Sequence, residues 1–416
     1  MQYKTIFRLL GVLLLIFGQS MLTPLLINVI FHEDVWLPFI SGYFFTEITG
    51  FVFWLSFINS RSELKIRDGF LLVVLFWVAI CLFAAIPLVL ALSSTVLSLT
   101  DAVFEAVSGI TTTGASVIQN LDALPHAVLF YRQQLQFIGG IGIVILAVAI
   151  LPMLGVGGMQ LFQAETPGPM KDNKLTPRIT QTAKVIWSIY LLLTVLCALS
   201  YFFAGMNWFE ALAESFGTVS TGGFSLHSAS FGYYKNPVIH VIGCVFMLLG
   251  GTNFALHFFA LKKKTLASYR NDEEFRFYLG IILAVSILVC YTFLRLHPLD
   301  FNLNVIVASF FTSISLLTTT GLEINTAASW RSFTPFLGML LMIIGGCAAS
   351  TSGGLKVLRV LLIYKQSKRE LVKVLHPQAI LPVKIGQNRV SDLTIQSVWG
   401  FISIFAGLYL FFSLVF

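Results

Sequence analysis

The sequence has little charge. Only 11% of its 416 residues are charged, whereas 57% are hydrophobic, and the mean hydropathy is +0.86. A water-soluble domain carries about 25% charged and about 45–50% apolar residues. This shortage of charged side chains excludes a soluble enzyme, a nucleic-acid module and a secreted disulfide scaffold as first interpretations. It predicts an integral membrane protein.

Cysteine is also scarce, and the pattern of the cysteines is uninformative for chemistry. The five residues lie inside apolar runs and form no CxxC pair; they are Cys81, Cys197, Cys244, Cys290 and Cys347. This pattern favours small buried hydrophobic residues over a disulfide framework or a metal site. The apolar runs also contain no nucleophile–base pair and no cluster of metal ligands, so we do not expect an enzyme.

Nine apolar stretches are long enough to cross a bilayer, for which a helix needs about 20 residues. They are 10–30, 36–58, 69–97, 127–154, 185–205, 236–261, 277–294, 333–355 and 393–416. Most of the 26 lysines and arginines fall in alternate connections between these stretches. By the positive-inside rule, those connections and the N-terminus are cytoplasmic. Topology therefore accounts for the net charge of +7, and we expect contact with membrane lipid and no nucleic-acid partner.

Three outer connections resemble one another: 101–117, 207–225 and 302–323. Each begins with a short helical pattern, and each is too short to span a bilayer and too apolar for open water. They predict re-entrant segments, each a pore helix followed by a loop. Each contains a cluster of small residues: Thr111-Thr112-Thr113-Gly114, Val219-Ser220-Thr221-Gly222 and Thr318-Thr319-Thr320-Gly321. Recurrence at roughly 100-residue intervals predicts repeats about one axis.

These clusters suit a cation filter. Glycine permits the unusual backbone angles that turn carbonyl groups toward an axis, where they replace a cation's hydration shell. The partly negative C-terminal end of each pore helix also favours a cation there. We expect the ion to bind at Thr112, Thr113, Ser220, Thr221, Thr319 and Thr320. Three hydroxyl-rich loops of one pattern do not by themselves distinguish K⁺ from Na⁺.

A run of ten small residues, 345–354, interrupts the eighth apolar stretch. Glycine costs a helix about 1 kcal/mol relative to alanine, so this run is a poor helix former. It could serve close packing between continuous helices, or it could break the helix and line a cavity. We favour the second interpretation and expect a gate formed by Gly345, Gly346, Gly353, Gly354 and Lys356.

Several acidic residues fall in apolar surroundings. Asp101, Glu105, Glu210 and Glu214 lie around the first turns of the expected pore helices. We favour helix capping and dipole compensation for all four, with attraction of cations to the outer mouth as the alternative. Glu47 lies near the middle of the second stretch. There we favour a hydrogen-bonded residue over a proton or ion ligand.

Five motifs resemble a known family. They are LKIRDGF at 64–70, FYRQ at 130–133, LAVAILP at 146–152, QAETPGP at 163–169 and GGCAASTSGGLKV at 345–357. With the three filter-like clusters, they make the chain similar to the Trk/Ktr/HKT superfamily of potassium transporters. The resemblance implies an all-α polytopic membrane protein. It also implies pseudo-fourfold helix–pore loop–helix repeats around a central ion pore, preceded by two extra transmembrane helices.

The resemblance divides the chain into five parts. Residues 1–61 would form the two extra helices, 62–165 pore repeat one, 166–270 repeat two, 271–384 repeat three with gating loop 345–354, and 385–416 the start of repeat four. The family pattern continues into a fourth filter loop and a final helix, so we expect this chain to be part of a longer protein.

The resemblance also implies a function. We expect K⁺ uptake across a bacterial inner membrane, with K⁺ as the transported and bound ion and no organic cofactor. The alternative on the same scaffold is a secondary transporter that couples K⁺ to H⁺ or Na⁺ in symport. The implied partners are a second copy of the chain, as a homodimer, and a cytoplasmic nucleotide-binding regulatory ring of the TrkA type.

Overall fold

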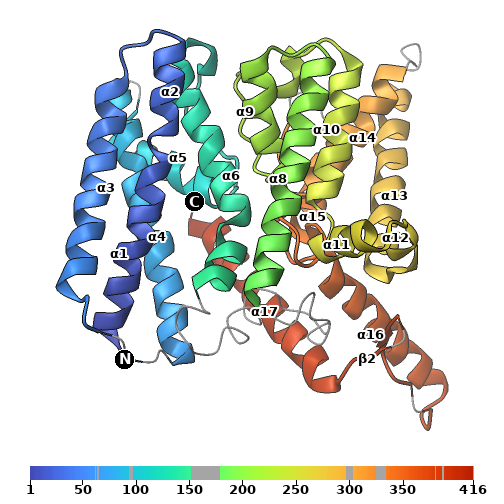
Figure 1. The fold of residues 1–416 in the computed structure, drawn as a ribbon. Coiled ribbons are helices and arrows are strands. Elements are labelled where there is room, and N and C mark those ends of the chain that lie inside the picture. Colours follow the sequence, from blue (N-terminus) through green and yellow to red (C-terminus); the bar gives the residue numbers. More distant parts are fainter. Residues whose placement is uncertain are drawn as a thin grey trace.

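The computed structural model describes residues 1–60, 62, 65–92, 97–150, 179–296, 303–324, 334–379, 381–386 and 388–415. These residues are almost entirely helical (Figure 1), apart from a hairpin of strands β1 (Lys384–Ile385) and β2 (Asn388–Arg389). By length and composition, five of the described helices could cross a membrane, or six if one bent pair counts as a single span. The described chain is therefore the α-helical membrane protein that its composition predicts.

The N-terminal helices pack through small residues. Helices α1 (Tyr3–Ser20) and α2 (Thr23–Ile30) form the first predicted span, and α3 (Trp36–Ser56) forms the second. A β-carbon on Gly11 would lie 2.6 Å from the carbonyl oxygen of Gly50, so α1 and α3 touch backbone to backbone. Glu47 accepts a hydrogen bond from the Gln19 side chain at 2.8 Å. This contact agrees with the hydrogen-bonded interpretation of Glu47.

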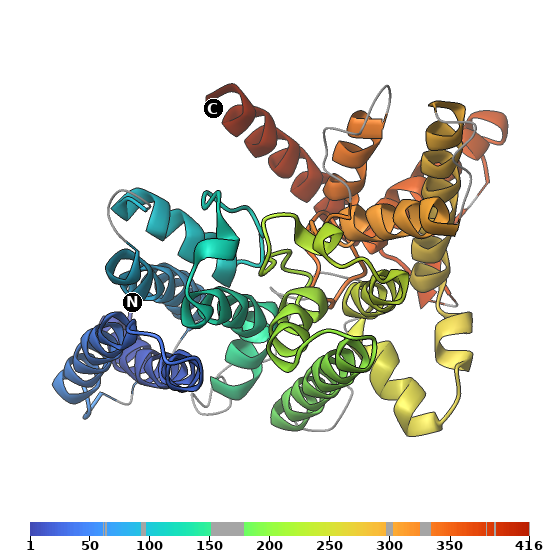
Figure 2. The same ribbon diagram turned by 90° about the horizontal axis from the view of Figure 1, so that it is seen from above.

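Three units of three helices follow, and in each unit the second helix is shorter than the first. The first is α4 (Ile66–Ala91), α5 (Leu99–Ile110) and α6 (His126–Ile150); the second is α8 (Ile179–Phe203), α9 (Trp208–Val219) and α10 (Pro237–Gly250); the third is α13 (Glu273–Leu296), α14 (Leu303–Leu317) and α15 (Thr334–Ile344). The short turns η1 (Leu121–Ala123) and η3 (Ser230–Tyr233) lie in the first two return limbs. Seen from above, the loops after α5, α9 and α14 approach one another near the centre (Figure 2).

The short helices start at clear capping signals. Ser98 and Asp101 form a reciprocal capping box at the start of α5. The Asn207 side chain accepts a hydrogen bond from the Glu210 backbone at 2.8 Å and caps α9. Capping of this kind satisfies backbone N–H groups that have no partner inside the helix. The expected boundary between repeats one and two, at 165/166, and the motif at 163–169 lie outside the described residues.

The predicted continuous span 236–261 is wrong. Helix α10 ends at Gly250, and α11 (Phe254–Lys263) leaves at an angle of 97°. Two tertiary contacts account for the break, because the carbonyl groups of Gly250 and Gly251 accept hydrogen bonds from residues of the 345–354 run. The Asn253 side chain then caps α11 by accepting from the Ala255 backbone at 2.9 Å. A short helix, α12 (Ala267–Asn271), leads into α13.

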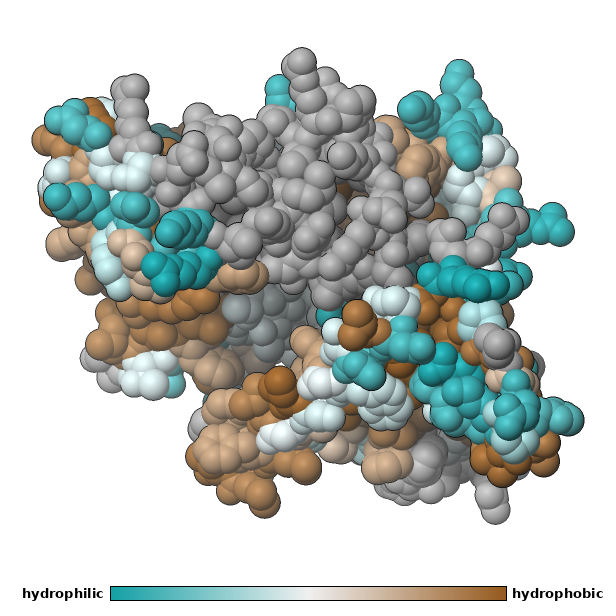
Figure 3. Space-filling view, turned by 90° about the horizontal axis from the view of Figure 1, so that it is seen from below, coloured by the Kyte–Doolittle hydropathy of each residue, from teal (hydrophilic) through white to brown (hydrophobic). Residues whose placement is uncertain are grey.

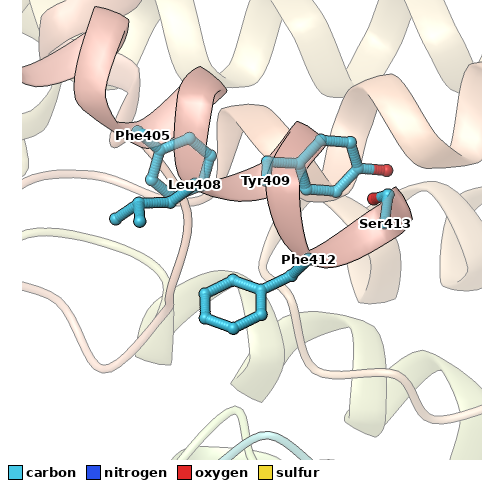
Figure 4. Close-up of a pocket in the computed structure, with 5 residues that line it drawn as sticks. All are labelled: Phe405, Leu408, Tyr409, Phe412 and Ser413. Carbon is cyan, nitrogen blue, oxygen red and sulfur yellow. The ribbon is translucent and has the colours of Figure 1, made fainter. Parts of the chain in front are cut away.

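The last two helices leave the body of the molecule. Helix α16 (Val357–Leu375) projects at the end where the N-terminus lies (Figure 1), and hydrophilic side chains gather on that face beside hydrophobic ones (Figure 3). Helix α17 (Asp392–Val415) buries only Ile395. Its apolar side chains include Phe405 and Phe412, which help to line an open pocket on the surface of α17 (Figure 4).

Candidate ion pathway

The loops that follow α5, α9 and α14 trace one backbone path. In each loop a threonine takes a left-handed conformation, and a glycine does so two residues later. The pairs are Thr112 (φ 53°) with Gly114 (77°), Thr221 (52°) with Gly223 (87°), and Thr319 (55°) with Gly321 (83°). Left-handed backbone is costly for threonine, so its recurrence at three equivalent points marks a shared and constrained geometry.

Hydrogen bonds confirm the same alignment. In each loop, the residue between the threonine and the glycine donates a backbone hydrogen bond to a carbonyl oxygen in the last turns of the preceding helix. The Thr113 N–H donates to the Ser108 carbonyl at 2.8 Å, the Gly222 N–H to the Gly217 carbonyl at 2.9 Å, and the Thr320 N–H to the Ser315 carbonyl at 2.8 Å. Gly222 is therefore equivalent to Thr113 and Thr320. The helices α5, α9 and α14 end at the equivalent residues Ile110, Val219 and Leu317.

This alignment corrects the predicted register of the second loop by one residue. The sequence pattern pairs Gly222 with Gly114 and Gly321, but Gly223 takes that conformation. Val219, predicted as a loop residue, is the last residue of α9. Because residues 222 and 223 are both glycine, composition could not show which of them adopts the left-handed angle.

The loops touch one another through their glycines. A β-carbon on Gly114 would overlap the carbonyl oxygen of Gly222, and one on Gly223 would overlap the carbonyl oxygen of Thr320. Loop one therefore contacts loop two, and loop two contacts loop three, backbone against backbone. Only residues without a side chain allow this approach.

The 345–354 run breaks its helix, as favoured from the sequence. Helix α15 ends at Ile344 and α16 starts at Val357. Gly345 (φ 78°) and Gly354 (φ 75°) form a narrow neck between them. The Val357 N–H donates to the Gly346 carbonyl at 2.9 Å and closes this neck. The run is thus a closed loop between two helices.

The 345–354 loop contacts the second and third filter-like loops directly. The Thr351 hydroxyl donates to the carbonyl oxygen of Val219 at 3.1 Å. The Gly353 N–H donates to the hydroxyl oxygen of Thr319 at 2.7 Å. The Cys347 N–H donates to the carbonyl oxygen of Gly251, beyond the end of α10, at 2.8 Å. These contacts place the loop against the C-terminal ends of α9, α10 and α14.

Two charged side chains bind the backbone of this loop. Glu274, buried at the start of α13, accepts from the Ala348 N–H at 2.6 Å. The Lys356 ammonium group donates to the carbonyl groups of Ser350 and Ser352. Lys356 was predicted here. Glu274 was missed because an acidic residue in the first turn of a helix has an ordinary reading as a dipole partner.

The predicted capping role of Glu105 and Glu214 is wrong. Both side chains are fully buried, and neither lies in the first turn of its helix. Glu105 accepts from the Ser116 hydroxyl at 2.9 Å, and Glu214 accepts from the Ser225 hydroxyl at 2.7 Å. Each carboxylate therefore fixes the limb that returns from a filter-like loop. Their burial also argues against attraction of cations at the outer mouth.

Arg132 balances this buried acid. Its Nε atom donates to Oε1 of Glu105 at 2.7 Å, and both side chains have no more than 1% of their surface exposed. Removing one partner of such a pair would leave a buried charge uncompensated. The signal in the sequence was the FYRQ motif, in which an arginine stands inside an apolar stretch.

Three short helices, two of them with capped starts, three glycine loops in mutual contact and a further loop packed against them define an α-helical polytopic membrane protein. Comparison with known proteins names the family. A family model described as "TrkH: Cation transport protein" matches residues 38–416. The chain belongs to this TrkH family of cation transport proteins.

Individual relatives are similar over nearly the whole chain. The Trk system potassium uptake protein TrkH of Halomonas elongata is 47% identical over 98% of this chain and 84% of its own length. The protein of the same name from Salmonella typhimurium is 45% identical over the same shares. The crystal structure of the potassium transporter TrkH from Vibrio parahaemolyticus superposes with a TM-score of 0.88 at 40% identity, covering 99% of this chain and 84% of that one.

Proposed function

We propose that this chain takes up K⁺ across a bacterial inner membrane through a filter lined by backbone carbonyl groups. The names of the relatives, which describe potassium uptake, support this substrate. The observation that carries the proposal is the shared left-handed path of three glycine loops that touch through their backbones. Such loops can offer carbonyl oxygens in place of a hydration shell.

The ion-binding residues follow from the corrected alignment. The proposed filter comprises Thr111–Gly114, Ser220–Gly223 and Thr318–Gly321. We place K⁺ at the carbonyl groups of the two middle residues of each loop, which are Thr112 and Thr113, Thr221 and Gly222, and Thr319 and Thr320. A potential that is negative inside drives one charge inward by about 2.3 kcal/mol per 100 mV, so passive conduction would suffice for accumulation. K⁺ is the cargo, and the proposal requires no organic cofactor.

The 345–354 loop is the proposed gate. Its hydrogen bonds to Thr221 and Thr319 support this role, since they hold it against two filter loops. Lys356 and the four glycines at the ends of the loop, Gly345, Gly346, Gly353 and Gly354, would let the loop close or withdraw. Withdrawal would break these few hydrogen bonds and would leave the filter loops in place.

The test is ion flux into proteoliposomes that contain the full-length protein. With a membrane potential that is negative inside and no other gradient, we expect K⁺ and Rb⁺ to enter much faster than Na⁺. Equal entry of all three ions would contradict the proposed filter. Symport predicts a different result, in which a proton or Na⁺ gradient at zero potential drives K⁺ against its own gradient.

The topology and partners are part of the same proposal. The N-terminus and the basic α16 lie at one end of the molecule, which supports a cytoplasmic location for both. The relatives are named as parts of a Trk system, which supports assembly with other components, here a homodimer on a nucleotide-binding ring of the TrkA type. Light scattering of the purified protein, alone and mixed with such a ring, tests both contacts.

A further inference from the structure

Helix α6 presents three polar side chains to the filter-like loops from inside an apolar environment. Arg132 and Gln133 have 1% of their surface exposed, and Gln136 has none. Polar groups buried in this way normally have a specific hydrogen-bonding role. All three residues lie on α6, but they do not bind the same loop.

Arg132 acts on the first loop. Its guanidinium group pairs with Glu105 and also donates to the Ser116 hydroxyl at 3.0 Å. Ser116 lies two residues beyond Gly114, so the contact fixes the backbone just after the filter residues. The same guanidinium group lies 4.2 Å from the ring centroid of Phe224, which belongs to the second loop.

Gln133 and Gln136 act on the second loop. The Gln133 amide donates to the Phe224 carbonyl oxygen at 2.8 Å, and the Gln136 carbonyl accepts from the Phe224 N–H at 3.1 Å. Both backbone polar groups of the residue after Gly223 are thus held by α6. The Gln136 carboxamide also packs so tightly on Gly222 that a β-carbon there would overlap it.

We propose that Arg132, Gln133 and Gln136 are positioning residues that set ion selectivity by fixing the first two filter loops against one helix. The inference rests on the proposed function. A filter discriminates by how many carbonyl dipoles surround the ion and how firmly they are held. If these contacts with α6, which we call the brace, are weakened, the loops can close around a smaller ion. The flux of Na⁺ then rises relative to that of K⁺.

The third loop is held in another way. The Ser315 hydroxyl of α14 donates to the carbonyl oxygen of Leu322, next to Gly321, at 2.8 Å. Loop three is therefore tied to its own pore helix and, through Thr319, to the 345–354 loop, whereas loops one and two share α6. The contacts with α6 thus fix the first two loops relative to each other.

The chain offers a matched control on the same helix. Gln134 is also buried, with 7% of its surface exposed, but it faces the N-terminal helices. Its amide donates to the Ser20 carbonyl oxygen at 2.7 Å, and its carbonyl accepts from the Thr23 hydroxyl at 2.7 Å. Gln134→Met and Gln136→Met therefore remove the same chemical group from sites of similar burial, and only one of these sites touches the filter loops.

The experiment compares Rb⁺ and Na⁺ flux through the full-length protein and these two variants in proteoliposomes. We expect Gln136→Met to lower the Rb⁺/Na⁺ ratio about fivefold, the effect of one lost hydrogen bond of ordinary strength. Gln134→Met should leave the ratio unchanged, although both variants lower the melting temperature. A ratio in Gln136→Met equal to that of the parent, or an equal fall in both variants, would overturn the inference.

A substitute variant and the selectivity of the parent protein distinguish failure of the brace from failure of the proposed filter. If Gln136→Met does not fold, Gln133→Met removes the donor to Phe224 and takes its place in the comparison. A parent protein that does not discriminate between Rb⁺ and Na⁺ would refute the proposed filter itself. A selective parent with an equally selective Gln133→Met or Gln136→Met would refute only the brace.

Discussion

The side-chain hydroxyl oxygens of Thr221 and Thr351 lie 3.1 Å apart, although 130 residues separate them in the chain. Thr221 is the left-handed threonine of the second filter loop, and Thr351 lies in the 345–354 loop. The contact means that the proposed gate rests directly on the proposed filter. Movement of either loop therefore changes the hydrogen bonding of the other.

Releasing this contact should open the gate. In Thr351→Val the shape of the side chain is kept, but the hydroxyl, whose single proton is shared between the carbonyl oxygens of Val219 and Gly250, is lost. A hydrogen bond of this kind contributes about 1 kcal/mol, so we expect K⁺ flux to rise about fivefold with the Rb⁺/Na⁺ ratio unchanged. Flux through the full-length protein in proteoliposomes at a fixed potential measures this change.

Ser350→Ala is the control for that variant. The Ser350 hydroxyl donates to the Cys347 carbonyl oxygen at 2.6 Å, inside the loop itself. Its loss should change flux far less than the loss of the Thr351 hydroxyl. Reduced flux in a folded Thr351→Val protein would mean that the loop supports conduction and does not block it.

The corrected register makes Gly223 a sharp test of the filter. Alanine at this position is strained by the backbone angle of 87° and would collide with the Thr320 carbonyl oxygen. We expect Gly223→Ala to lower the Rb⁺/Na⁺ flux ratio at least about fivefold, since strain of about 1–3 kcal/mol must distort one of the two loops. Gly280→Ala in α13, where a β-carbon meets no atom within 4 Å, should keep the parent's ratio.

Close contact of α1 and α3 predicts a stability effect that is separate from ion flux. In Gly11→Ala the new methyl group would lie 2.6 Å from the Gly50 carbonyl oxygen and from the Trp54 nitrogen. Overpacking of this kind costs about 1–3 kcal/mol, so the melting temperature in detergent should fall. Gly407→Ala in α17, with open space around it, should melt like the parent. Equal melting of all three proteins would show that α1 and α3 can move apart freely.

The return limbs of the first two loops are joined by a titratable contact. Nδ1 of His227 lies 2.6 Å from Asp122 of η1, and Nε2 lies 3.6 Å from Glu210 of α9. Burial alone would lower the pKa of His227, but the hydrogen bond to the Asp122 carboxylate and the nearby carboxylates of Glu210 and Glu214 outweigh it. The pKa is therefore raised above its ordinary 6.5. Asp122, bonded to His227, has its pKa lowered below 3.8 despite some burial.

These directions predict how stability depends on pH. Because folding raises the pKa of His227, its contribution is fully present below pH 6.5 and is lost as pH rises through the folded-state pKa. The melting temperature of the full-length protein should fall over that window. The fall should be smaller in His227→Gln, which does not titrate. A parent and a variant with parallel pH profiles would show that the histidine contact contributes nothing. Asp122 acts at acid pH, because its contribution to stability is lost as pH falls below its ordinary pKa of 3.8.

Much of the fold could be predicted because it depends on local properties of the chain. The apolar runs, the short helical patterns and the hydroxyl–glycine clusters each depend on a few neighbouring residues. They were enough to place three short helices, their loops and the broken helix at 345–354. The family resemblance, which the comparisons confirm, rests on the same local motifs.

The errors share a different cause. The left-handed angle falls on Gly223 because that residue must pass the Thr320 carbonyl, and α10 ends at Gly250 because a distant loop takes its hydrogen bond. Arg132 reaches Glu105, and Gln136 reaches Phe224, only once the pore helices have packed on α6. The sequence by itself therefore determined a helical membrane protein with three glycine loops. Tertiary structure alone decided how those loops align and what holds them, because contacts between segments far apart in the chain set both.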